Sequence, residues 1–380
     1  MKKIDGFNIV LINLDGLRQD KIDLCPFLKT FKEENLNFQN IFTVAPYTFA
    51  SLHAIFSSTY PSKNGVNAYY NMFKFKENEC VTLAEILKSK NYFTSCDIIS
   101  NSVMPKKGID DWNLFDEKDV DFIDRHTKLI KKLSTKEKFF VFLHYTEVHK
   151  NLVREIVQRY KENDEDFFKL IKENDERYNT QLPSCDEYVS SIIKTLKEEN
   201  IWKKTILIIF SDHGASIGEK KGEKFYGTYT YDYTIRVCCT ARIPGETSKN
   251  ITKQCRTIDI FPTILELVGI ENEYFNKIQG KSLIPLIENP KSEDREVFVE
   301  TGGLYGPWPS PKKHNVFCIR TKNHKLVYND TPQNWEFYDL EKDPKENDNM
   351  YNEHSPKIKE LKKKMITHFK ENEIKTNLNI

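Results

Sequence analysis

The sequence predicts an α/β protein with a large, mostly parallel sheet, followed after about residue 290 by a small antiparallel sheet and a helix. Two observations carry this prediction. Continuous β-branched runs alternate with helical patterns up to about residue 270, as expected where helices connect parallel strands. Short alternating runs then replace them. We therefore expect a domain of residues 1–290 and a subdomain of residues 291–380.

Three apolar runs predict the central strands, namely 7–14 (FNIVLINL), 138–145 (KFFVFLHY) and 205–211 (TILIIFS). The apolar residues in them are continuous rather than alternating, which is typical of strands buried on both faces of a parallel sheet. Helical patterns lie between and after these runs. The predicted helices are 25–35, 82–91, 185–200 and 258–270.

Residues 151–180 form a highly charged stretch. Its composition favours a solvated helical excursion, and a lid beside a site is the other interpretation. Near the C-terminus, residues 354–369 predict an amphipathic helix that caps the small sheet. The strands expected in that sheet are REVFVE, NVFCIR, HKLVYN and WEFYDL.

Composition argues against two classes of protein. Lys and Arg number 57 against 56 Asp and Glu, so the chain lacks the basic field of a nucleic-acid binder. No stretch reaches about 18 apolar residues and the first apolar run is too short for a signal peptide, so we expect no membrane span and a cytoplasmic location. The eight cysteines are scattered without a C-x-x-C pair, and we expect reduced core residues.

Two predicted strands end in acidic residues, Asp15 and Asp212, and His213 follows the second directly. Ligands of open α/β sheets bind beyond the carboxyl ends of the strands, so these side chains are expected to converge. One divalent ion, Mn²⁺, Zn²⁺, Mg²⁺ or Ca²⁺, accepts this mixture of oxygen and nitrogen ligands. The other interpretation of Asp15, which precedes a glycine, is a simple turn former.

Residues 43–66 (TVAPYTFASLHAIFSSTYPSKNGV) contain several hydroxyl side chains and no carboxylate. If a helix begins at Thr48, its first N–H groups and its dipole form an anion site, which a carboxylate would oppose. Thr48 would then lie between a metal and a bound phosphate or sulfate, where coordination makes a hydroxyl a nucleophile. The alternative is an ordinary helix cap formed by Thr48 with Ser51.

Ordered segments spread from about residue 7 to 350 resemble the successive landmarks of the type I sulfatase family of the alkaline phosphatase superfamily. They are NIVLINLDGLRQD, TVAPYTFASLHAIFSSTYPSKNGV, ILKSKNYFTSCDIISN, FFVFLHYTEVHK, ILIIFSDHGASIGE, YDYTIRVCCTARIPG, IDIFPTILELVGI, GKSLIPLI and EFYDLEKDPKENDN. The resemblance implies a layered α/β/α core like that of alkaline phosphatase.

The chain departs from the sulfatase pattern at the nucleophile. Sulfatases carry a Cys or Ser there that becomes formylglycine, within a C/S-x-P-x-R signature, whereas Thr48 occupies the position here and the Pro and Arg are absent. We therefore expect no formylglycine. An unmodified Thr resembles the phosphodiesterase and phosphotransferase branches of the superfamily. Gly16 replaces a usual second Asp, as is common in the phosphodiesterase branch. That branch has further Asp and His ligands for a second metal, for which only Glu147 and His149 are partial candidates here, so a one-metal site of Asp15, Thr48, Asp212 and His213 is expected.

The resemblance also suggests further site residues. His149 matches an active-site His that contacts the anionic group or the leaving oxygen, and Lys224 lies near a Lys that binds substrate oxygens, with Lys221 as a competitor. For Arg18 and Lys63 a solvated surface position is the alternative to anion contact, and for His144 a structural role. Tyr305 and Trp308 are candidates for a pocket wall. The substrate-binding candidates are Arg18, His144, Glu147, Tyr226 and Tyr305.

These residues predict a metal-dependent hydrolase or transferase of phosphate esters that forms a phospho-Thr48 intermediate, with His149 assisting the leaving alcohol. The expected substrate is a small-molecule, glycan or lipid-headgroup ester. One alternative is a sulfate-ester hydrolase that works without formylglycine. Another is a binding protein on a sulfatase scaffold, against which the retention of Asp15, Asp212 and His213 argues.

Overall fold

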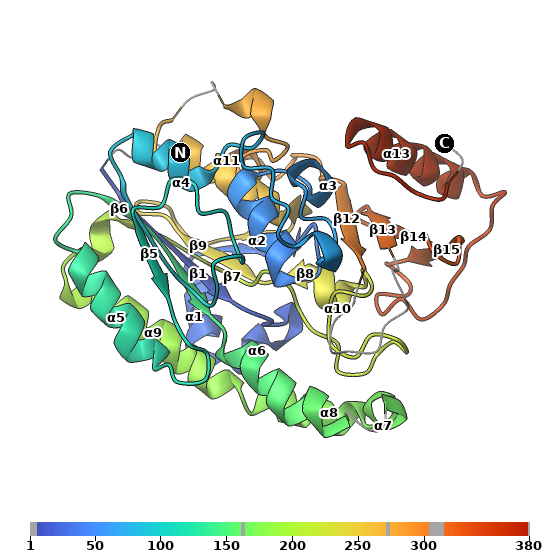
Figure 1. The fold of residues 1–380 in the computed structure, drawn as a ribbon, viewed down its shortest axis with the longest axis horizontal. Helices are drawn as coiled ribbons and strands as arrows, with labels where there is room; N and C mark the ends of the chain where they lie inside the picture. The colour runs from blue at the N-terminus through green and yellow to red at the C-terminus, as the bar shows by residue number, and fades with distance from the viewer. Residues whose placement is uncertain (1–5, 161–163, 271–273, 304–314, 379–380) are drawn as a thin grey trace.

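The computed structural model describes residues 6–160, 164–270, 274–303 and 315–378. A large sheet crosses the molecule with helices on both faces, and a small sheet with the C-terminal helix stands beside it (Figure 1). The layered α/β architecture predicted from the sequence is confirmed. The predicted boundary at residue 290 falls between the last helix of the layered part and the first strand of the small sheet.

The central sheet contains eight strands, and its middle is parallel, as predicted. Their bounds are β1 Asn8–Leu14, β2 Leu36–Phe38, β4 Phe93–Ile98, β5 Asp111–Leu114, β6 Phe139–Tyr145, β7 Thr205–Phe210, β9 Cys239–Arg242 and β10 Lys249–Ile251. The order is β10-β2-β9-β7-β1-β6-β4-β5. β1 pairs in parallel with β6 and β7, and β9 is antiparallel to β7 and β2. A short second sheet joins β3 (Ile41–Phe42), β8 (Arg236–Val237) and β11 (Cys255–Arg256).

Alternate residues of the parallel strands point to opposite faces and pack into two separate cores. Ile9 and Leu11 face the side covered by α2 (Thr48–Ser57), α4 (Leu83–Ser89), α11 (Ile260–Leu267) and α12 (Ile284–Glu288). Val10 and Ile12 face the side covered by α1 (Pro26–Glu34), α5 (Phe122–Leu133) and α9 (Leu182–Glu198). Figure 1 shows α5 and α9 below the sheet and α2, α4 and α11 above it.

Two predicted helices differ from the structure at their ends. The helix expected at 185–200 begins earlier, at Leu182, because Pro183 suits a first helical turn. The helix expected at 258–270 is divided into a 3-10 turn, Thr257–Asp259, and α11. Two further short helices are α3 (Pro61–Asn64) and α10 (Asp232–Ile235).

The charged stretch at 151–180 is helical where it is described, as predicted. It contains the end of α6 (Glu147–Leu152), a π-helical turn (Val153–Val157), a 3-10 turn (Gln158–Tyr160), α7 (Asp164–Lys169) and α8 (Ile171–Asn179). α8 is fixed to the loop after β1, because the Tyr178 hydroxyl accepts from the Arg18 N–H and donates to the Gly16 carbonyl. The excursion is therefore anchored beside the ends of the central strands.

The predicted small sheet consists of β12 (Val297–Gly302), β13 (Asn315–Arg320), β14 (His324–Asn329) and β15 (Asn334–Asp339), all antiparallel, and α13 (Pro356–Glu371) packs against it. A buried ion network joins this sheet to the core. The Asp232 carboxylate of α10 lies 2.8 Å from Arg320 Nη2 and 2.6 Å from Lys325 Nζ, and Lys325 also pairs with Glu346.

All eight cysteines are buried and free, as predicted. Among the described residues, no helix combines the length and the apolar character needed to cross a bilayer.

Candidate metal and nucleophile site

The alternation of side chains along the strands places three polar residues under α2. Asp15, His144 and Asp212 each continue the set of alternate strand residues that packs on the α2 side of the sheet. β1 lies between β6 and β7, so Asp15 has His144 on one side and Asp212 on the other. Asp15 and Asp212 lie one and two residues beyond the ends of β1 and β7, so parallel pairing and strand parity bring these groups together at the carboxyl ends of the strands.

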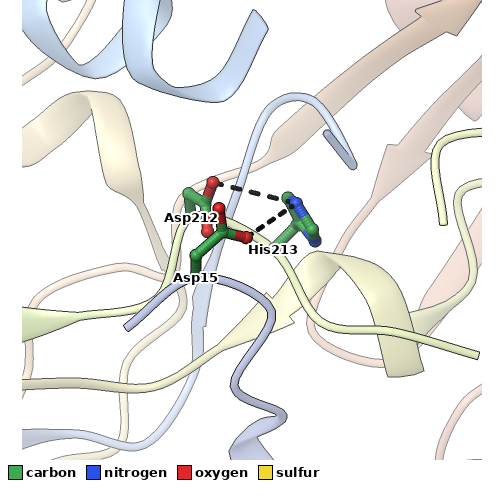
Figure 2. A group of neighbouring side chains, drawn as sticks. All are labelled: Asp15, Asp212 and His213. Atoms are coloured by element: carbon green, nitrogen blue, oxygen red, sulfur yellow. Dashed lines mark ion pairs between the residues drawn. The ribbon is translucent and has the colours of Figure 1, made fainter. Parts of the chain in front are cut away.

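Figure 2 shows Asp15, Asp212 and His213 converging, with the imidazole directed at both carboxylates. His213 Nε2 is 3.5 Å from Asp15 Oδ1 and 3.8 Å from Asp212 Oδ2. One ligand atom of each residue lies within 4.8 Å of the others, and all three residues are buried. The sequence-predicted cluster is thus assembled.

The His213 ring is held in the orientation that a metal ligand requires. Its Nδ1 lies 2.7 Å from the Gly214 carbonyl, which can only accept, so Nδ1 carries the proton and the Nε2 lone pair faces the carboxylates. The next residue must be glycine, because a Cβ on Gly214 would lie 2.2 Å from the Tyr233 carbonyl oxygen.

Unpartnered buried oxygens indicate that the site is built for a cation. Asp15 Oδ1 and both carboxylate oxygens of Asp212 are buried and have no hydrogen-bond partner among the described residues. Two facing carboxylates without donors are costly in a protein interior unless a cation balances them. Together with His213 Nε2 they form a hard and borderline donor set that suits a divalent metal.

The local charges shift the pKa values of the two carboxyl groups in opposite directions. Burial raises the pKa of Asp15, but His149, His144 and His213 outweigh it, so the pKa lies well below its ordinary value. Burial and then the charge of Asp15 raise the pKa of Asp212 above its ordinary value. His144 Nε2 is 2.9 Å from Asp15 Oδ2, which leaves Oδ1 as the oxygen that points into the cluster.

Thr48 joins this cluster from the opposite side. Its Oγ1 is 3.1 Å from His213 Nε2 and 3.5 Å from Asp15 Oδ2. It is the first residue of α2 and not the cap, since Tyr47 occupies the cap position and makes no side-chain cap bond. Ser51 instead donates to the Asp212 carbonyl. The interpretation of Thr48 and Ser51 as an ordinary cap is therefore wrong, and the first-turn N–H groups have no side-chain acceptor from the cap residue.

His149 lies at the rim of the cluster, with 19% of its side chain exposed. Its Nε2 is 3.0 Å from the Tyr226 hydroxyl, and its Nδ1 is 3.9 Å from Glu117 Oε1. The Tyr226 ring also contacts His213, with 4.3 Å between the ring centroids. Burial lowers the pKa of His149, but the negative charges of Asp15, Glu117 and Asp212 outweigh this and raise it.

The partners that the structure gives Lys224 and Arg18 do not belong to the cluster of Asp15, Asp212 and His213. The buried Lys224 amine donates to the Tyr160 carbonyl at 2.5 Å, and the competitor Lys221 is exposed. The Arg18 guanidinium forms ion pairs with Asp20 and Glu219.

Arg18 is buried, so the surface alternative is wrong for it. It lines a groove of about 700 Å³ whose described walls include none of the four predicted metal ligands. Lys63 is exposed, in agreement with the solvated surface position predicted as the alternative for it. The Glu147 carboxylate accepts from Lys150 and Asn151. Tyr305 and Trp308 lie outside the described residues.

Sequence reasoning missed Glu117, which lies in the loop after β5. No motif or periodic pattern distinguishes it from the acidic residues around it. His144 is a predicted substrate contact with a structural role as the alternative; it is fully buried and its imidazole lies 2.9 Å from Asp15 Oδ2, so it supports a predicted metal ligand.

Comparison with known proteins identifies the family of the chain. The model of the Sulfatase family matches residues 8–270, and that of the N-sulphoglucosamine sulphohydrolase C-terminal region matches residues 222–375. A curated relative, the N-acetylglucosamine-6-O-sulfatase of Bacteroides thetaiotaomicron, is 30% identical over 196 residues, which are 48% of this chain and 33% of the relative. The alignments span about a third of the length of the first curated relatives.

Two solved structures share the fold at low identity. One, described as a complex with its substrate D-glucosamine-2-N,6-O-disulfate, has a TM-score of 0.76 at 17% identity and covers 97% of this chain and 98% of its own. The other, a phosphonate monoester hydrolase from Silicibacter pomeroyi, has a TM-score of 0.72 at 16% identity and covers 96% of each chain. Since the family model matches more than half of the chain, this protein belongs to the Sulfatase family.

Proposed function

We propose that this protein hydrolyses or transfers anionic esters through a covalent intermediate on Thr48, and that phosphate esters are preferred to sulfate esters. The position of the Thr48 hydroxyl, 3.1 Å from His213 Nε2 and 3.5 Å from Asp15 Oδ2, carries this proposal. A nucleophile within hydrogen-bond distance of a ligand cluster and of a proton acceptor is the arrangement that covalent catalysis requires.

Asp15 Oδ1, Asp212 and His213 Nε2 would hold one divalent ion, with Thr48 beside them. Such an ion, when bound, lowers the pKa of a hydroxyl and neutralises developing charge on the transferred group. The preserved ligand set supports an enzyme over a binding protein on a sulfatase scaffold.

The chain's own groups then position the reaction. The Thr48 hydroxyl donates to Asp15 Oδ2, whose orientation His144 fixes from the other side, and this contact positions the Thr48 oxygen for attack. The first turn of α2 offers N–H groups and the positive end of the helix dipole to the oxygens of a bound phosphate or sulfate. His149, at the exposed rim, reaches the side from which the leaving alcohol departs.

Phosphate is preferred for a chemical reason. Threonine carries a β-methyl group and cannot become formylglycine, so the route that expels sulfate from a formylglycine hydrate is closed to this chain. A phospho-Thr intermediate needs only attack by water or by an acceptor alcohol on phosphorus. The phosphonate monoester hydrolase with the same fold agrees with a phosphoryl substrate.

The second candidate is a sulfate-ester hydrolase that uses Thr48 directly, and the similarity to the N-acetylglucosamine-6-O-sulfatase favours it. That name and the substrate of one structural neighbour concern glucosamine esters. We infer on these grounds that the alcohol portion of the substrate belongs to a glycan, whichever acid it carries.

The test is an ester panel with matched variants. Sugar 6-phosphate, bis(4-nitrophenyl) phosphate, 4-nitrophenyl phosphate and 4-nitrophenyl sulfate are assayed with Mn²⁺, Zn²⁺, Mg²⁺ or Ca²⁺. Thr48→Ala is expected to abolish turnover while metal still binds, and Thr48→Ser to keep part of the activity. Thr82→Ala is the control, since Thr82 caps α4 through Glu85 N–H and its loss costs about 1 kcal/mol of stability without touching the site.

The intermediate provides a direct readout. A slowly turned-over phosphate ester, quenched rapidly, is expected to add one phosphoryl mass to the peptide that contains Thr48. Full activity of Thr48→Ala would exclude the covalent route. Turnover of the sulfate with none of the phosphates would instead select the second candidate.

A further inference from the structure

Glu117 is an acidic side chain placed beside the rim of the site without a structural task in the described part of the chain. It lies in the loop that connects β5 to α5. Its side chain is 28% exposed, yet Oε1 is buried and accepts no hydrogen bond from the described residues. A buried carboxylate oxygen left without a donor costs about 1–3 kcal/mol, so its direction calls for a functional reason.

The group that this oxygen faces is His149. The Nδ1 atom of His149 lies 3.9 Å from Glu117 Oε1, and Nε2 on the other side of the ring lies 3.0 Å from the Tyr226 hydroxyl. The Phe225 ring packs against the imidazole, with 5.3 Å between the centroids, and limits its rotation. One nitrogen thus faces a carboxylate, and the other faces the side of the ring on which Tyr226 and His213 lie.

We propose that Glu117 is a positioning residue for His149. The Glu117 carboxylate accepts a hydrogen bond from Nδ1–H of His149 and thereby keeps Nε2–H directed at the leaving oxygen of the substrate. This rests on the proposed ester-transfer function and adds to it the residue that makes His149 a proton donor. A carboxylate, an imidazole and a reacting oxygen in this order form the relay by which an orienting group fixes the tautomer of a catalytic histidine.

The proton balance of the step follows from these positions. The Thr48 oxygen forms a bond to phosphorus, or to sulfur in the second candidate, and its proton is released to solvent water. The bond from phosphorus to the leaving oxygen breaks, and that oxygen keeps the electron pair and takes the Nε2 proton of His149. The Nδ1 proton stays shared with Glu117, so His149 ends as a neutral imidazole. It takes up a proton again from the water that hydrolyses the intermediate.

Leaving-group dependence tests this role. 4-Nitrophenolate departs without a proton, whereas a sugar alkoxide must receive one. Glu117→Gln is therefore expected to slow the sugar 6-phosphate about 10-fold or more, which is part of the ~10²–10⁴-fold contribution of general acid catalysis, and to change 4-nitrophenyl phosphate less than twofold. Glu117→Asp is expected to recover part of the loss. Asp119→Asn is the control, because it removes the same charge from an exposed position in the same loop.

A second measurement does not depend on activity. Nitrogen-15 spectra of the histidine rings, with His149 identified by comparison with His149→Ala, report which ring nitrogen carries a proton. In the full-length protein near neutral pH we expect a proton on Nδ1 of His149 that is depleted in Glu117→Gln and retained in Asp119→Asn.

The two measurements separate the possible failures. Equal slowing of both esters by Glu117→Gln, or spectra of His149 that Glu117→Gln leaves unchanged, would overturn the positioning role while the Thr48 reaction stands. If no ester turns over, the function proposed for Thr48 fails, and the ring spectra still decide whether Glu117 controls the His149 proton.

Discussion

His144 offers the sharpest test of how the site is supported. Its imidazole is completely buried and lies 2.9 Å from Asp15 Oδ2, next to the aromatic rings of Phe115 and Phe142. The substitution His144→Phe keeps an aromatic ring of similar size in this aromatic environment and removes the hydrogen bond. Asp15 then loses the contact that turns Oδ1 toward Asp212.

The magnitude follows from the contact. A hydrogen bond to a charged carboxylate contributes about 1.5–3 kcal/mol, and about 1.4 kcal/mol corresponds to a tenfold change in a binding constant. Only the part of this energy that orients Asp15 appears in metal binding, so a loss of about 10-fold in Mn²⁺ affinity is expected, at the lower end of the range for partners of metal ligands.

The assay is calorimetric titration of metal-stripped protein with Mn²⁺, alongside urea unfolding. His126→Phe is the matched control, since His126 is equally buried and hydrogen-bonded, to the Tyr188 hydroxyl at 2.7 Å. Both variants are expected to lose stability, and only His144→Phe to lose affinity. Wild-type affinity in His144→Phe, or an equal loss in both variants, would refute the reasoning.

Three further predictions concern buried charges. Asp212→Asn removes a carboxylate that repels Asp15, so the metal-free variant should unfold at a higher urea concentration than metal-free wild type, and its Mn²⁺ binding should be lost. A urea midpoint below that of wild type would contradict this prediction. Burial raises the pKa of Glu223 from 4.5 to about 7, so the folded state binds the proton of this carboxyl group more tightly than the unfolded state does. The stability that this proton binding contributes is fully present below pH 4.5 and is lost as the pH rises through 7. The free energy of unfolding of Glu223→Gln, measured with urea, should therefore rise by about 3 kcal/mol relative to wild type as the pH is raised from 5 to 8. If the variant and wild type lose stability in parallel over this pH range, the result would count against the prediction. Lys224→Met should lower stability by about 1–3 kcal/mol because the Tyr160 carbonyl loses its donor; unchanged unfolding together with lost turnover would instead support the catalytic role first assigned to this lysine.

Much of the fold follows from patterns that are local in sequence. Continuous apolar runs predicted β1, β6 and β7 to within a residue or two, because strands buried on both faces need them along their whole length. The convergence of Asp15 with Asp212 and His213 followed from the rule that parallel strands present their carboxyl ends at one edge. The start of the helix at Thr48 was likewise correct.

The features that could not be predicted depend on the order of the strands in the sheet and on side-chain partners that are far apart in the sequence. The role of His144 requires β6 to be the neighbour of β1, and no local pattern states strand order. Lys224 donates to the carbonyl of Tyr160, 64 residues away, so its motif position did not determine where its amine points. Glu117 lies in a loop, where neither hydrophobic periodicity nor secondary-structure propensity distinguishes a functional residue from its neighbours.

The ion network around Asp232 has a consequence for any shortened form of the chain. α10 carries Asp232, and its Thr234 carbonyl receives the N–H of Gly214, the residue after His213. Arg320 and Lys325, which neutralise Asp232, come from β13 and β14. A protein cut at residue 290 would keep every predicted metal ligand, yet Asp232 would lose both cations that neutralise it, in the short helix whose Thr234 carbonyl holds the backbone beside His213. The last ninety residues thus supply the counterions of the part of the chain that carries the predicted metal ligands, and we expect the two parts to be inseparable.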